Sequence, residues 1–214
     1  MAQRKGVRRI VAGQKLPRSF YLRPTFIVAR DLLGKHLVRC IRRTRLIGKI
    51  VEVEAYLGEK DPASHAYRGL TKRNEVMFRE GGHLYVYFTY GMHHCCNVVT
   101  EEEGTAGAVL LRAIEPVEGI ETMRKNRGWS AGVLEKWSMH QQVNLTNGPA
   151  KLCEALGIGR AENGTDLLGD QIYITKGTMI ARSTIVASTR IGITNASEKK
   201  WRFYIRGNPW ISKE

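Results

Sequence analysis

Two carboxylates and a tyrosine alternate along one short segment of the sequence, IVEVEAY. Glu52, Glu54 and Tyr56 are two residues apart, so the two-residue period of a strand puts them on one face. Val51 and Val53 then lie on the opposite face, toward a core. A carboxylate beside an aromatic ring can act as a general base or stabilise a developing positive charge. A solvated strand face would explain the two glutamates equally well, so this segment alone does not define a site.

A second segment adds aromatic rings that can stack on a flat ligand. His83, Tyr85 and Tyr87 alternate along one predicted strand, and Tyr90 follows at a Tyr-Gly corner where a hairpin turn is expected. Aromatic residues at this period usually belong to the core. Together with Tyr56, however, they supply the rings that a pocket for a nucleobase requires, because every base has a π face.

A third segment, VLLRAIEP, contains one arginine in an otherwise apolar strand. A buried guanidinium needs an anionic partner or must line a cleft. We therefore expect Arg112 to pair with Glu54 or Glu52.

The charge balance indicates the partner. The chain of 214 residues has 34 Lys and Arg against 20 Asp and Glu, a net charge of +14, which favours a polyanion. The sequence has no apolar run long enough for a spanning helix and no lipidation motif, so we expect no membrane partner. Nucleic acid is therefore the favoured polyanionic partner. The four cysteines lack metal-binding spacing, and neighbours in His93-His94-Cys95-Cys96 point to opposite faces of a strand. We expect reduced thiols, no metal and no cofactor.

Strands are expected to carry all three segments. The predicted strands are His36 to Ile41, Leu46 to Tyr56, Leu84 to Thr89, His94 to Thr100, Ala108 to Ile114, Gln171 to Thr175, Thr184 to Ile191 and Trp201 to Ile205. The predicted helices run from a cap at Thr25 toward Gly34, from Val117 to about Arg127, and from Gly148-Pro149 to Gly157. Short connections between strands favour an α+β class with a curved antiparallel sheet and surrounding helices. We expect a flexible basic arm over 1–18 and a single domain over 19–214.

Several long motifs, in order, resemble the alkyladenine (3-methyladenine) DNA glycosylase family. The motifs are IVEVEAYLG, LYVYFTYGM, LLRAIEP, GPAKLC and the ending RFYIRGNPW, and the resemblance covers roughly Phe20 to Ser212. Such a set is far more specific than any short pattern. The resemblance implies a fold similar to the C-terminal domain of formyltransferases, with a positively charged DNA face.

The resemblance also implies roles for the residues that match the family's motifs. Glu54 corresponds to the glutamate that activates a water molecule, and Arg112 to the arginine that helps to hold that water. The flipped base would lie between Tyr56 and Tyr87 on one side and His65 on the other.

Further positions match the family's DNA contacts. Tyr90 resembles the wedge that fills the gap left by the flipped nucleotide, and Asn97 the asparagine that obstructs the exocyclic amine of guanine. Ala63, in the Pro-Ala-Ser-His segment before His65, is expected in the base pocket. Lys151, in the first turn of a predicted helix, is expected to contact a DNA phosphate. Packing and support are the expected roles of Tyr85 and Glu52.

The sequence thus predicts a monofunctional DNA glycosylase of base excision repair. Its expected substrates are the 3-methyladenine, 7-methylguanine, hypoxanthine and ethenoadenine class in double-stranded DNA, and its product is an abasic site. We expect a monomer that is cytoplasmic and nucleoid-associated in a prokaryote, or nuclear in a eukaryote. Two alternatives stay open: a non-catalytic RNA- or DNA-binding module of formyltransferase-like shape, and a bifunctional glycosylase/lyase that uses an amine nucleophile.

Overall fold

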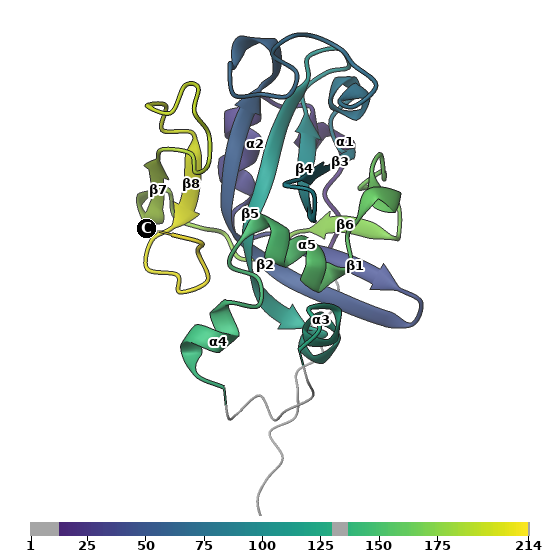
Figure 1. Cartoon of the computed structure of the whole chain (residues 1–214), viewed down its shortest axis with the longest axis vertical. Helices are drawn as coiled ribbons and strands as arrows, with labels where there is room; N and C mark the ends of the chain where they lie inside the picture. Colours follow the sequence, from purple (N-terminus) through teal and green to yellow (C-terminus); the bar gives the residue numbers. More distant parts are fainter. Residues whose placement is uncertain (1–12, 130–136, 214) are drawn as a thin grey trace, which may run out of the picture.

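An eight-stranded antiparallel sheet organises the protein in a computed structural model that describes residues 13–129 and 137–213 (Figure 1). Its strands are β1 (His36–Ile41), β2 (Thr44–Leu57), β3 (Leu84–Thr89), β4 (His93–Thr100), β5 (Gly107–Glu118), β6 (Ile172–Thr175), β7 (Ile185–Ser188) and β8 (Arg202–Ile205). The order is β3-β4-β5-β2-β1-β6, and β8 joins β2 to β7. The predicted class, a single α+β domain, is confirmed.

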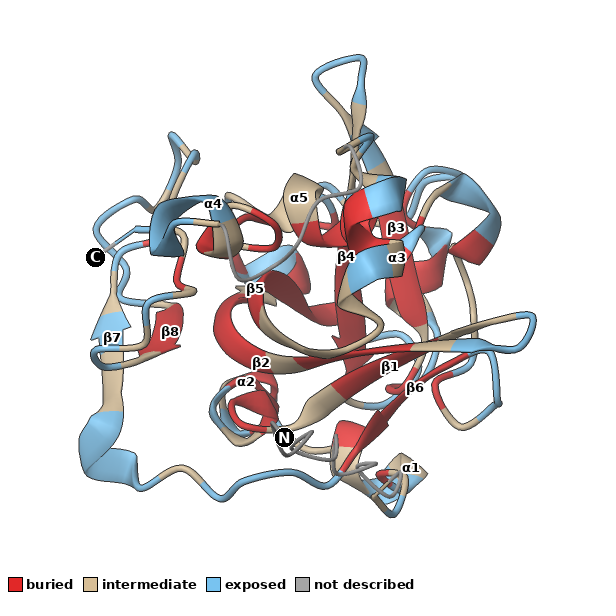
Figure 2. Ribbon diagram, turned by 90° about the horizontal axis from the view of Figure 1, so that it is seen from below, coloured by how far each residue is buried: buried red, intermediate tan, exposed pale blue. Residues whose placement is uncertain are grey.

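Strand β2 is the centre of this sheet. Its first half pairs with β1 and its second half with β8, while β5 pairs along the other edge. The register with β5 shifts on both sides of Glu52, which marks a β-bulge. A bulge bends a strand and increases its twist, and Figure 2 shows β2 and β5 curving together as largely buried ribbons.

The bulge corrects one prediction about this strand. The strand period predicts that Val51 shares a face with Val53, but Val51 packs with Ala113, Tyr204 and Ile211, whereas Val53 packs in the main core. The extra residue at the bulge breaks the two-residue period. Downstream of the bulge the period holds.

Helices and short 3-10 turns surround the sheet. They are α1 (Arg18–Tyr21), α2 (Thr25–Leu32), α3 (Ile120–Asn126), α4 (Met139–Val143) and α5 (Pro149–Leu156), with 3-10 turns at Gly58–Lys60, Glu75–Phe78, Arg160–Glu162 and Arg182–Thr184. Helix α2 packs on β2 and β5, and α5 packs on β4 and β5. Their apolar faces join the strands in one main core. Helix α5 begins with Gly148-Pro149 and ends at Gly157 in the left-handed conformation, as predicted.

The boundaries of two helices differ from the predictions. Helix α3 begins at Ile120 and not at Val117, because β5 continues to Glu118 and Gly119 then turns the chain with φ +78°. A Cβ atom at Gly119 would lie 2.4 Å from Leu46, so only glycine fits there. Thr25 is the first residue of α2 and not its cap; the carboxylate of Glu101 accepts its backbone N–H at 3.0 Å.

Part of the expected basic arm falls within the described residues. Leu16 is buried and its N–H donates to the Ile174 carbonyl at 2.9 Å. Arg18 donates to the carbonyl of Gly81 and to Asp166, each at 2.8 Å. Residues 13–18 therefore lie against the domain, and residues 1–12 lie outside the described part.

Candidate active site

A cavity of about 540 Å³ opens where strands β2, β3, β4 and β5 meet two loops. The loops are the one after β2 and the segment 191–195, which belongs to the connection between β7 and β8. The predicted site residues among its lining are Tyr56, Ala63, His65, Tyr87, Tyr90, Asn97 and Arg112. The fold thus brings together residues from several separate strands and loops.

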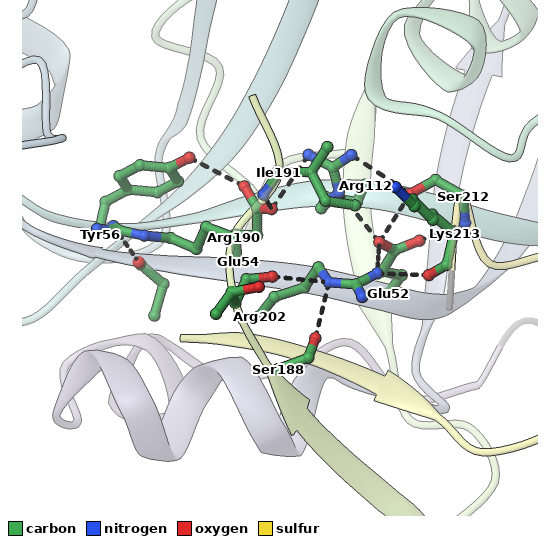
Figure 3. Close-up of polar contacts among 12 residues, drawn as sticks. Glu52, Glu54, Tyr56, Arg112, Ser188, Arg190, Ile191, Arg202, Ser212 and Lys213 are labelled. Carbon is green, nitrogen blue, oxygen red and sulfur yellow. Dashed lines mark hydrogen bonds and ion pairs between the residues drawn. The ribbon is translucent and has the colours of Figure 1, made fainter. Parts of the chain in front are cut away.

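Glu54 lies completely buried beside this cavity and is not one of its lining residues. Three groups that do line it hold the carboxylate. The Ile191 N–H donates to Oε1 at 2.8 Å, Arg112 Nη1 lies 3.2 Å from Oε1, and the Tyr56 hydroxyl donates to Oε2 at 2.9 Å (Figure 3). Because a carboxylate has about four lone-pair positions, Oε2 keeps one acceptor position. Glu54 is 0% exposed, so a neighbouring group must shift before a water in the cavity can reach this position. The structure thus excludes the solvated strand face that the sequence left open.

The surroundings of Glu54 shift its acidity in opposing directions. Burial raises the pKa of Glu54 above its ordinary value, and this effect outweighs those of Arg112, the Ile191 N–H and the Tyr56 hydroxyl, which lower the pKa. Glu54 is therefore a stronger base than an exposed glutamate. Burial likewise raises the pKa of Tyr56, so its hydroxyl stays a hydrogen-bond donor to Glu54 at neutral pH.

Arg112 lies between the two glutamates and contacts both, whereas the sequence predicted a partner in Glu54 or Glu52. Its Nε donates to Glu52 Oε1 at 3.1 Å, while Nη1 pairs with Glu54. Glu52 is also fully buried and accepts from Arg202 Nη1 at 2.9 Å and from the Ser212 hydroxyl at 2.8 Å. Glu52 therefore orients Arg112 and connects the C-terminal segment to β2, which fits the supporting role expected of it.

Aromatic rings form another wall of the cavity. Tyr85 and Tyr87 stack with centroids 5.7 Å apart and planes 28° apart. The His65 ring meets Tyr87 edge-on, with centroids 4.5 Å apart, and its Nδ1 hydrogen-bonds with the Tyr85 hydroxyl at 3.0 Å. Two rings that sandwich a base lie about 7 Å apart, twice the van der Waals contact distance. His65 must therefore turn or shift before a base can stack between it and Tyr87.

The remaining predicted pocket residues lie at the rim and on the walls. Tyr90 is 81% exposed at the tip of the β3–β4 hairpin, with φ +51°, followed by Gly91 with φ +68°. Asn97 is buried, and its Nδ2 donates to the Tyr85 carbonyl at 3.3 Å. The Ala63 N–H donates to Asp61 at 3.1 Å. The predicted hairpin turn at Tyr90-Gly91 is confirmed.

Lys151 does not line the cavity. Its Nζ donates to Asn144 Oδ1 at 2.5 Å and to Asn147 Oδ1 at 2.8 Å, near the first turn of α5. Burial, and secondarily Arg127, lower the pKa of Lys151. Contact with a phosphate stays a prediction and would require Lys151 to exchange at least one of these partners.

Sequence reasoning missed three residues that shape the site. The Ile191 N–H contacts Glu54, and a backbone donor leaves no trace in the residue type. Asp61 and Arg190 form a buried ion pair beside Tyr56, 129 positions apart in sequence. In the sequence, Arg190 is an isolated arginine just before Ile-Gly, and this was the available signal for a buried arginine. No neighbouring residue indicated that its partner is Asp61.

The described ranges offer neither a metal centre nor a membrane span. Among residues 13–129 and 137–213, no three His, Cys, Asp or Glu side chains form a group that could hold a metal ion. No helix within those two ranges has the length and apolar character to span a bilayer.

An aromatic cavity that can hold a flat ring is typical of enzymes that act on a base turned out of DNA, and the buried carboxylate beside it can serve as a general base. The charge of +14 fits the same class. Comparison with known proteins agrees with this class. Residues 19–209 match the family described as Methylpurine-DNA glycosylase (MPG). The chain belongs to this family and is a DNA glycosylase, a hydrolase of DNA repair.

Bacterial proteins provisionally named 3-methyladenine DNA glycosylase are similar over nearly the whole chain. The protein of Carboxydothermus hydrogenoformans is 53% identical over 93% of this chain and 99% of its own length. That of Prosthecochloris aestuarii is 50% identical over 92% of this chain and 90% of its own length. That of Clostridium perfringens is 48% identical over 94% of this chain and its entire length.

Proposed function

We propose that this chain is a monofunctional glycosylase that flips 3-methyladenine and related alkylated or deaminated purines out of double-stranded DNA and hydrolyses their bond to the sugar. The related bases are 7-methylguanine, hypoxanthine and ethenoadenine. The single observation that carries the proposal is the carboxylate of Glu54, buried against Arg112 and Tyr56 beside an aromatic cavity. The names of the similar bacterial proteins support 3-methyladenine as a substrate.

The first step of the proposed reaction takes the damaged base out of the stack. Unstacking costs a few kcal/mol and costs less when damage has already weakened the pairing. Tyr90 fills the gap that the base leaves, and the base enters between Tyr56 and Tyr87 on one side and His65 on the other. A cationic alkylated purine gains further attraction from the electron-rich rings. Asn97 obstructs the exocyclic amine of guanine, and Ala63 contributes to the wall beside His65.

Bond cleavage follows at the sugar. Breaking the glycosidic bond develops positive charge there, which the Glu54 carboxylate stabilises while it takes a proton from the attacking water. The oxygen of water forms the new bond to the sugar, and the base leaves with the electron pair of the old bond. A cationic alkylated base thereby leaves as a neutral purine, whereas neutral hypoxanthine or ethenoadenine takes up a proton from solvent as it leaves. Arg112 helps to hold the water and orients Glu54. No cofactor takes part in these steps.

Phosphate contacts supply most of the affinity for DNA in this proposal, with Lys151 among them. We infer a monomer that resides with the DNA of a prokaryotic cell. We also propose that the fold is similar to that of the C-terminal domain of formyltransferases. Superposition of the sheet of this chain on the sheet of that domain tests the proposal.

The test of the proposed activity is release of the free base from duplexes that each contain one defined lesion. Chromatography detects the free base, and the strand should stay intact until alkali cleaves it at the abasic site. Borohydride added during the reaction should trap no covalent complex, because the proposed nucleophile is water and not an amine. A trapped complex would assign the chain to the bifunctional glycosylase/lyases.

Base release should decline in acid, and the decline should begin at a higher pH than an exposed glutamate would give. The reaction needs ionised Glu54, and burial raises the pKa of Glu54, so protonation begins at higher pH than for an exposed glutamate. On 7-methylguanine duplexes, where the base is already cationic, the acidic limb of the single-turnover rate should therefore have its midpoint above the ordinary glutamate value of 4.5. A midpoint at or below that value contradicts a buried carboxylate base.

Tyr90→Ala should impair lesion processing without changing stability. Tyr90 is 81% exposed, so the free energy of unfolding should not change measurably. Loss of stacking in the DNA gap, about 1–3 kcal/mol for an aromatic contact with a base, should weaken lesion-duplex binding roughly 5- to 150-fold. Fluorescence anisotropy with labelled duplex measures this, and Met179→Ala, an equally exposed apolar side chain that does not line the cavity, is the matched control. Equal affinities of both variants for the lesion duplex would show that Tyr90 does not fill the gap in the DNA.

A further inference from the structure

Asp61 and Arg190 form a bidentate ion pair in which both side chains are completely excluded from solvent. Arg190 Nη1 donates to Asp61 Oδ2 at 2.5 Å, and Nη2 donates to Oδ1 at 2.8 Å. Nη1 also donates to the Ala55 carbonyl of β2 at 3.0 Å. The pair thus connects the loop after β2, the chain after β7 and β2 itself.

Asp61 and Arg190 each directly precede a segment that forms one wall of the cavity. The four residues after Asp61, 62–65, line the cavity, and so do the five residues after Arg190, 191–195. A second contact joins the same two walls, because Asn195 Nδ2 donates to the Pro62 carbonyl at 3.4 Å. The Asp61–Arg190 pair therefore sets the distance between the first residues of the two wall segments.

Arg190 also contacts the groups around Glu54. Its guanidinium carbon lies 4.6 Å from the centroid of the Tyr56 ring and 4.9 Å from that of Trp201. Figure 3 shows Arg190 beside Tyr56 and the next residue, Ile191, directed toward Glu54. The hydrogen bonds of Tyr56 and Ile191 to Glu54 both depend on backbone that Arg190 holds.

Stability alone does not explain this arrangement. A buried ion pair is often no more stable than an apolar pair of similar volume, because both ions lose their hydration. Arg190 Nε is moreover buried without a hydrogen-bond partner among the described residues, which adds to the cost. What the pair does supply is orientation, since the planar guanidinium and the carboxylate meet in one geometry.

We propose that Asp61 and Arg190 are positioning residues for base excision: they hold Tyr56 and the Ile191 N–H on Glu54 and set the two cavity walls. The inference rests on the proposed role of Glu54 as the base. It predicts that uncoupling the pair slows catalysis and changes the titration of Glu54, even where the fold tolerates the change.

The double variant D61N/R190M tests this inference. It removes both charges, and the introduced asparagine keeps an oxygen for the Ala63 N–H. We expect a folded protein whose single-turnover excision rate is lower by about 10- to 100-fold, the effect of small displacements in an active site, with lesion binding reduced by less. The acidic limb should move to higher pH, because the Ile191 N–H that favours ionised Glu54 is no longer held in place.

A second buried ion pair provides the matched control. Arg39 Nη2 lies 2.7 Å from Glu162 Oε1, the two side chains are only 8% and 11% exposed, and neither residue lines the cavity. E162Q/R39M should therefore leave the excision rate and the acidic limb unchanged, whether or not its melting temperature changes. If D61N/R190M does not fold, R190K is the second variant, because lysine keeps the charge but not the bidentate contact. R190K should lower the excision rate and shift the midpoint of the acidic limb to higher pH.

Each outcome decides the inference. A folded D61N/R190M or R190K variant with the wild-type rate and acidic limb overturns it, as does an equal loss of rate in E162Q/R39M. Failure of the proposed function looks different: wild-type protein would release no base, or Glu54→Gln would release it as fast as wild type.

Discussion

Glu54→Gln should reduce the single-turnover rate of base release by at least about 1,000-fold and leave lesion binding within a few-fold of wild type. General-base catalysis contributes roughly 10²- to 10⁴-fold, and the charge facing the sugar in the transition state adds to it. Glutamine has the same shape and can still accept the Ile191 N–H. The aromatic walls and the phosphate contacts, which hold the lesion, are unchanged.

Two measurements on one duplex separate the chemistry from binding. Base release is followed by chromatography, and affinity by fluorescence anisotropy at the same pH and salt concentration. Glu162→Gln is the matched control, because Glu162 is also a buried carboxylate paired with an arginine but lies outside the cavity. A Glu54→Gln enzyme that keeps more than a tenth of the wild-type rate would show that another group activates the water.

Arg112→Met should lower the free energy of unfolding by about 3–5 kcal/mol, the usual cost of leaving a buried charge without its partner. Arg112 is 6% exposed and lies between two fully buried carboxylates. Glu52 keeps Arg202, but Glu54 keeps only its two neutral donors. At about 2–4 °C per kcal/mol for a domain of this size, the melting temperature should fall by roughly 6–20 °C. Urea unfolding at pH 7 measures the change.

The double variant Arg112→Met, Glu54→Gln distinguishes lost charge balance from lost packing. Removing the uncompensated carboxylate should recover part of the stability, whereas a packing defect would persist. Arg45→Met, at a partly exposed pair with Glu118, should cost less than about 1 kcal/mol. Equal losses at Arg112 and Arg45 would contradict the electrostatic account.

The three arginines of the site perform separate tasks that residue type alone does not reveal. Arg112 contacts both glutamates, Arg202 secures Glu52 to the C-terminal segment through the Lys213 carbonyl at 2.6 Å, and Arg190 pairs with Asp61. In a chain with 34 basic residues, such positions cannot be selected by composition. Their common property is burial beside a carboxylate, which the sequence indicated for Arg112 alone.

The chain's local patterns determined much of the fold. Alternating apolar residues located all eight strands, and the Gly-Pro start and Gly157 end located α5, because these signals act within a few residues. They failed at Val51 and Val117. At both places a feature of strand pairing decides the conformation: the bulge opposite β5 at Glu52, and the continuation of β5 alongside β2.

The amino-acid sequence was enough to predict the chemical groups of the site: a carboxylate, a guanidinium and several aromatic rings in a strongly basic chain. Three features became known only from the folded chain: Glu54 is buried and not solvated, Arg112 contacts both glutamates, and Asp61 pairs with Arg190. Burial, and with it the pKa of a carboxylate, depends on segments that lie far apart along the chain, and local residue spacing does not encode how those segments meet.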